Sequence, residues 1–60
     1  MKNVKMKVEG NELVIRVDLS KQIGPSKSGK TTIIGTTAGN KDVPEQEGMQ
    51  IGVNVFKYNE

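Results

Sequence analysis

Residues 24–37 read Gly-Pro-Ser-Lys-Ser-Gly-Lys-Thr-Thr-Ile-Ile-Gly-Thr-Thr. The first eight match the phosphate-loop pattern G-x-x-x-x-G-K-[ST], which in nucleoside triphosphatases joins a buried strand to a helix. Six of the last seven are β-branched, and such residues favour a pleated strand over a helix. We therefore predict a strand at residues 30–37. The helix N-terminus that would bind phosphate is then missing, so the sequence argues against triphosphate hydrolysis.

The rest of the chain alternates apolar and polar residues with a period of two, which is typical of strands with one buried face. Four strands are predicted, at residues 4–8, 13–19, 30–37 and 51–58. Glu9-Gly10-Asn11-Glu12 forms a tight turn, so the first two strands make a hairpin. Long loops are expected at residues 20–29 and 40–49. The fold class is all-β: a single domain over residues 1–60, built as a small curved antiparallel sheet or partial barrel.

Glycines at positions 35 and 52 fall inside predicted strands. A glycine there often marks a bulge, a bend or the close approach of another backbone. The predicted core is thin, because the strands supply few large apolar side chains. We expect a second copy of the chain to cover the apolar face, giving a homodimer.

Composition limits the chemistry available to the chain. Sixty residues form a marginal domain, for which dimerisation is a common remedy. There is no cysteine and no histidine, so disulfides, thiolate zinc sites and the usual general base are excluded. We expect no catalysis, no cofactor and no metal. The N-terminus is too polar for a signal peptide and no apolar run approaches a membrane span, which predicts a cytoplasmic protein without membrane association.

Positive charge is concentrated in the first half of the chain. Residues 1–30 hold seven basic and three acidic residues, whereas residues 31–60 hold two basic and four acidic residues. Lysines, hydroxyls and glycine at residues 26–32 are groups that contact phosphate oxygens, and exposed aromatic rings on a sheet stack bases. This predicts binding of nucleic acid, with single-stranded DNA favoured. The candidate contacts are Lys5, Lys7, Arg16, Ser26, Lys27, Ser28, Lys30, Thr32, Phe56 and Tyr58.

Plainer interpretations stay open for the same residues. Ser, Gly, Pro and Lys also make up ordinary exposed loops. Phe56 and Tyr58, the two aromatic residues, are better suited to a core or a dimer interface than to base stacking. The chain as a whole would then be a protein-interaction or structural module with no nucleic-acid role. A third possibility is nucleotide binding without hydrolysis.

Two resemblances accompany these patterns. The Ser-x-Ser-Gly-Lys loop at residues 26–30, the β-branched strand ending near Gly39-Asn40 and the strand at residues 51–56 resemble short bacterial and phage proteins, a likeness that implies no activity. More remotely, residues 10–16 and the basic loop at residues 27–31 are similar to the transcriptional-coactivator (whirly-like) single-stranded-DNA-binding family. That similarity implies a curved antiparallel sheet that binds DNA as a dimer, with Lys27, Lys30 and Arg16 as contacts. The family ends in a helix, whereas this chain is predicted to end in a strand.

Overall fold

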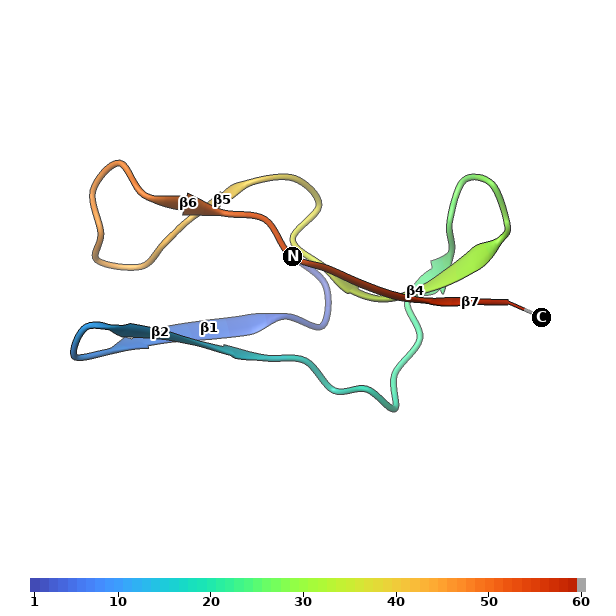
Figure 1. Ribbon diagram of the computed structural model, residues 1–60, viewed down its shortest axis with the longest axis horizontal. Coiled ribbons are helices and arrows are strands. Elements are labelled where there is room, and N and C mark those ends of the chain that lie inside the picture. The colour runs from blue at the N-terminus through green and yellow to red at the C-terminus, as the bar shows by residue number, and fades with distance from the viewer. Residues whose placement is uncertain (60) are drawn as a thin grey trace.

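The computed structural model describes residues 1–59, and within them every regular element is a strand (Figure 1). The strands form three small antiparallel sheets, ordered β1-β2, β3-β4-β7 and β5-β6. Their bounds are β1 Lys5–Glu9, β2 Glu12–Arg16, β3 Gly24–Pro25, β4 Thr31–Thr36, β5 Lys41–Asp42, β6 Gln50–Ile51 and β7 Asn54–Tyr58. The all-β antiparallel class is confirmed. The prediction of four strands is wrong, since residues 1–59 form seven, and these residues do not close into a barrel.

The β1-β2 hairpin follows the predicted pattern. A two-residue turn, Gly10-Asn11, joins the strands, and Gly10 has a φ of +59°. A positive φ at the first turn position is what a type II′ hairpin turn requires, and glycine adopts it without strain. Lys5 lies opposite Arg16 and Met6 lies opposite Ile15. The second strand is shorter than predicted, because it ends at Arg16.

Strand β4 lies at the centre of the three-stranded sheet. It pairs with β7 along most of its length, while β3 pairs with its other edge through Gly24 and Pro25. Strand β3 falls inside the segment predicted as a loop, so that prediction is corrected. The register of β4 against β7 shifts between Ile33 and Gly35. A β-bulge of this kind is one of the three features that the sequence analysis connects with a mid-strand glycine.

The N-terminal residues cross β4 beside Gly35. The backbone of Lys2 exchanges two hydrogen bonds with Thr36, and a Cβ at Gly35 would lie 3.1 Å from Asn3 O and 3.0 Å from Val17 Cγ1. The Asn3 side-chain amide donates to Asp18 O at 2.9 Å and to Ile34 O at 2.8 Å. We call these two hydrogen bonds the Asn3 bridge. It joins the segment that follows the hairpin to the central strand.

The second predicted loop and the last predicted strand are both divided. Strands β5 and β6 pair with each other. The two residues of β5 lie inside residues 40–49, which the sequence predicted as a loop. The predicted strand at residues 51–58 is interrupted at Gly52 and Val53. The buried Thr37 stabilises this break, because its hydroxyl accepts from Val53 N at 3.0 Å and donates to Gly39 O. The polar group therefore has partners on both sides.

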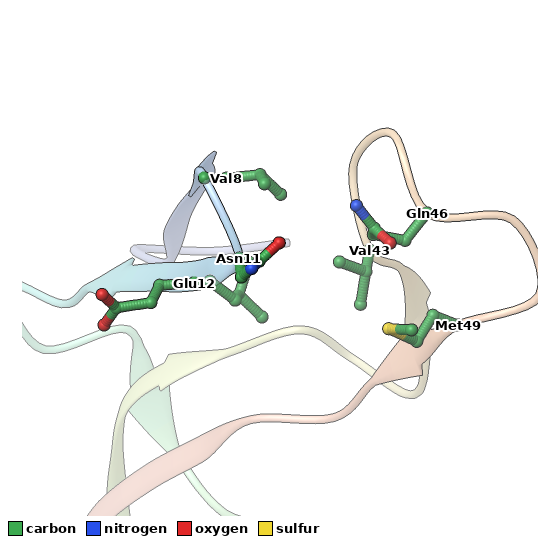
Figure 2. Close-up of a pocket in the computed structure, with 8 residues that line it drawn as sticks. Val8, Asn11, Glu12, Val43, Gln46 and Met49 are labelled. Carbon is green, nitrogen blue, oxygen red and sulfur yellow. The ribbon is translucent and has the colours of Figure 1, made fainter.

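The core is small, as predicted. Within the described residues the buried apolar side chains are Val4, Ile34 and Val43. At the far end of the hairpin, Val8 faces Val43 and Met49 across a cleft of about 160 Å³ that separates the hairpin from the β5-β6 loop (Figure 2). The molecule measures 40 × 21 × 13 Å, so it is little thicker than one sheet with its side chains. Residues 1–59 contain no helix of the length and apolarity needed to cross a membrane.

Candidate nucleic-acid interface

Residues 26–30 form a tight turn between β3 and β4. Ser26 N donates to Thr31 O and Gly29 N donates to Ser26 O, both at 3.0 Å. Gly29 has a φ of +74°, which suits glycine at the end of such a turn. Residues 31–36 continue as strand β4, which confirms the predicted strand. The eight residues that match the phosphate-loop pattern therefore close a hairpin and are not followed by a helix.

Serine hydroxyls accept hydrogen bonds from the backbone N–H groups at the end of this turn. Lys30 N donates to Ser28 Oγ at 3.3 Å, and Thr31 N donates to Ser26 Oγ at 3.4 Å. Successive free N–H groups could have formed an anion-binding nest, but these two already have acceptors. Contact with a phosphate would therefore use side chains. Those of Lys27, Ser28 and Lys30 are exposed.

Phe56 and Tyr58 lie on one face of the sheet, on strand β7. Their rings meet edge to face, with centroids 5.9 Å apart and planes at 81°. Phe56 is 50% exposed and Tyr58 is 76% exposed, so neither ring belongs to the core of the single chain. On the neighbouring strand, Ile33 is opposite Phe56 and Thr31 is opposite Tyr58. The rings thus form an open aromatic face.

The aromatic face extends to the base of the turn. A shallow hollow of about 270 Å³ is lined by Phe56, Ile33, Thr31 and Ser26, together with neighbouring residues of β7. Two groups that the sequence proposed separately, the hydroxyl-rich turn and the aromatic pair, are therefore adjacent. We call this end of the sheet the turn-aromatic site, comprising residues 26–31, Ile33, Phe56 and Tyr58.

Thr32 lies on the opposite face of the sheet. It is directly opposite Lys57, and its hydroxyl donates to Asn59 Oδ1 at 2.6 Å. Asn59 also donates from its side-chain amide to Gly29 O at 3.1 Å and from its backbone to Lys30 O at 2.9 Å. Asn59 therefore fixes the turn to the end of β7. The sequence analysis missed both Lys57 and Asn59; strand alternation indicates the face of Lys57, but no sequence pattern indicates the role of Asn59.

Lys5, Lys7 and Arg16 lie together on the outer face of the β1-β2 hairpin. Lys5 is directly opposite Arg16, and Lys7 follows two residues along the same face. Lys7 Nζ pairs with Glu9 Oε1 at 2.8 Å, between two exposed side chains. Such a pair contributes little to stability and leaves the cluster with less positive charge.

The hairpin cluster and the turn-aromatic site are separate. The β1-β2 turn and the turn at residues 26–30 lie toward opposite ends of the long axis (Figure 1). The sequence led us to expect one continuous basic track, whereas the structure has two separate positive regions. Lys21, which the sequence analysis did not select, lines a groove with Lys5 and Arg16.

Asp18 is the acidic group in that groove. Its Oδ1 accepts from Ser20 Oγ at 2.6 Å and from Ser20 N at 2.9 Å. The side-chain hydrogen bond, the backbone hydrogen bond and the nearby Lys21 charge hold the pKa of Asp18 below its usual range. The carboxylate therefore stays ionised and offsets part of the positive charge around Lys5, Arg16 and Lys21.

Among residues 1–59 no three His, Cys, Asp or Glu side chains gather in a way that could hold a metal ion. Comparison with protein families, curated proteins and solved structures found no match to this chain.

Proposed function

We propose that this protein binds single-stranded nucleic acid, with single-stranded DNA favoured, and that it acts without catalysis or a cofactor. The observation that carries the proposal is the exposed Phe56–Tyr58 pair beside the lysine- and serine-containing turn. Single-strand binders combine aromatic side chains that stack bases with cationic groups that follow the phosphates. The turn-aromatic site brings both kinds of group to one end of the sheet.

Each part of the site has a role in this proposal. Phe56 and Tyr58 stack bases, while Lys27, Lys30 and the Ser28 hydroxyl contact phosphates. A duplex hides the faces of its bases, so an open aromatic face selects for single strands. The hairpin cluster of Lys5, Lys7 and Arg16 contributes positive charge at a second place along a longer strand. The remote likeness to the whirly-like family and a cytoplasmic location are consistent with this role.

Fluorescence anisotropy with a labelled oligothymidylate tests the proposal. The wild type should bind at about 50 mM salt and bind much more weakly at about 200 mM, because each phosphate contact releases counterions. The double variant Lys27→Ala/Lys30→Ala should lower the slope of log K against log salt by roughly 1.4, since single strands contribute about 0.7 per contact. The control Lys2→Ala/Lys41→Ala removes the same charge from exposed positions elsewhere and should keep most of the slope.

The aromatic contribution is tested by Phe56→Leu and Tyr58→Leu. Both rings are exposed, so leucine removes the π face without opening a core cavity. Loss of a stacked base costs about 1–3 kcal/mol, which is roughly a 5- to 150-fold loss of affinity. Binding that is absent at low salt, or that all these variants leave unchanged, would refute the proposed function.

A second candidate, a protein-interaction module, is favoured by one observation. Strand β7 ends the three-stranded sheet and exposes two aromatic side chains, as strands that add to a partner's sheet do. This candidate predicts that the protein lacks salt-dependent affinity for oligonucleotides. The anisotropy titration therefore separates the two candidates.

A further inference from the structure

Strand β7 has an open edge within the described residues. It is the terminal strand of the order β3-β4-β7, and β4 is the one strand that it contacts. The direction of its backbone groups follows from two hydrogen bonds at its ends: Thr37 N donates to Val53 O, and Asn59 N donates to Lys30 O. The backbone groups of residues 53 and 59 therefore point toward the rest of the sheet. Because backbone groups alternate along a strand, those of Phe56 and Tyr58 point to the open edge.

The other strand edges in residues 1–59 are poorer templates for pairing. Strand β3 has two residues, one of them Pro25, which has no N–H to donate. Strands β5 and β6 also have two residues each. The β1-β2 hairpin carries Lys5, Lys7 and Arg16, and charged side chains of this kind discourage edge-to-edge pairing. Strand β7 also has five residues but carries a single charged side chain, Lys57, so it is the least protected of the longer edges.

The chain exposes more surface than a compact monomer of its mass. The chain exposes 4772 Å². A compact monomer of 6.6 kDa exposes about 3,900 Å², so the chain shows roughly 900 Å² more. Its radius of gyration is 12.9 Å, against about 10.4 Å for a compact chain of this length. The extended shape therefore leaves extra surface of the same order as the share of about 800 Å² that each partner contributes to a standard protein interface.

We propose that a second copy of this chain pairs with β7 along its open edge, antiparallel, about a two-fold axis at Phe56. In this register Phe56 is opposite its own copy and Asn54 is opposite Tyr58 of the second copy. Residues 54, 56 and 58 then use their outward backbone groups for hydrogen bonds. On the other face Lys57 is opposite Val55 of the second copy. Shifting the axis to Lys57 would place like charges opposite each other, which is destabilising.

The result is one six-stranded sheet, in the order β3-β4-β7-β7-β4-β3. The two-fold axis is perpendicular to this sheet, so Phe56 and Tyr58 of both copies lie on the same face. This inference does not rest on nucleic-acid binding. A dimer without oligonucleotide affinity, or a monomer that binds oligonucleotide, would separate the two proposals.

Sedimentation velocity tests the edge directly. The wild type should sediment at twice its 6.6 kDa mass. Tyr58→Pro removes a backbone N–H that faces the open edge and should yield a monomer with the far-UV circular dichroism of a sheet. Tyr58→Ala removes the same ring but keeps the N–H, so it should remain a dimer. A wild type that stays monomeric up to about 1 mM, or a folded Tyr58→Pro dimer, would overturn the proposal.

Single cysteines test the register, and the natural chain has none to interfere. In Phe56→Cys the two thiols would be on directly opposed residues, with Cα atoms about 5.5 Å apart, and mild oxidation should cross-link the dimer. In Lys57→Cys they would be offset by two residues, about 8 Å apart, and should cross-link at least tenfold more slowly. Faster cross-linking through position 57, or none through either position, would overturn the register even if Tyr58→Pro fails to fold.

Discussion

Replacing Gly35 by alanine is expected to destabilise the fold where the N-terminal segment lies against strand β4. The added Cβ would lie 3.0 Å from Val17 Cγ1, 3.1 Å from Asn3 O and 3.4 Å from Val4 Cγ2. The first two contacts are closer than ordinary packing permits. Asn3 cannot move away easily, because its side chain forms the Asn3 bridge and the backbone of its neighbour Lys2 is hydrogen-bonded to Thr36.

The size of the effect follows from two opposing terms. Overpacking of this kind costs about 1–3 kcal/mol. Alanine also restricts the unfolded chain, which returns roughly 0.4–1 kcal/mol where its backbone conformation is allowed. The net loss at Gly35 should be about 1–2 kcal/mol. In a 60-residue domain this lowers the Tm by roughly 5–15 °C.

Gly52→Ala is the matched control. Gly52 also interrupts a predicted strand, and its added Cβ would meet Asn40 Oδ1 at 3.0 Å. That atom is at the end of a side chain that can rotate away, so the change should stay within about 0.5 kcal/mol of wild type. Urea unfolding followed by far-UV circular dichroism, at one fixed protein concentration, measures both variants. If Gly35→Ala is as stable as Gly52→Ala, the close approach of the N-terminal segment to β4 is refuted.

Three further predictions concern polar contacts. Asn3→Ala removes the Asn3 bridge and places alanine at a φ of +56°, so urea unfolding should show a loss of about 2–3 kcal/mol, whereas the exposed Asn11→Ala should lose less than about 1 kcal/mol. Asp18→Asn should make the free energy of unfolding depend less on pH in the acid range. The lowered pKa of Asp18 means that its ionised carboxylate stabilises the fold at neutral pH, and this contribution is lost as pH falls through the folded-state pKa. Equal acid sensitivity in wild type and variant would contradict this reasoning. Asn59→Ala should raise hydrogen exchange at Gly29 and Lys30 several-fold while leaving the amides of the β1-β2 hairpin unchanged, as measured by NMR.

Local patterns were sufficient to predict some elements. The period of two and the Gly10-Asn11 turn predicted the first hairpin, and the β-branched run predicted β4. The same alternation placed Lys5, Lys7 and Arg16 on one face. These features depend on neighbouring residues alone.

The remaining features depend on residues that are distant in the sequence. Gly24 and Pro25 have weak strand propensity and form β3 because Ile33 and Thr32 offer a free edge. The break at Gly52 depends on the buried hydroxyl of Thr37. The expected continuous basic track is absent for a similar reason. Contacts of the N-terminal segment with β4 set the direction of the hairpin, and the alternation of apolar and polar residues does not predict those contacts.

The Asn3 bridge also sets the order in which the fold can assemble. The β1-β2 hairpin uses contacts close in sequence and should form within about 1–10 μs. The hydrogen bond from Asn3 to Ile34 O spans 31 residues, and Ile34 is held in place once β4 has found β7. Non-local pairing of this kind is slow, on the order of milliseconds to seconds. The hairpin should therefore exist early as a freely moving arm, and fixing its orientation should be among the last events of folding.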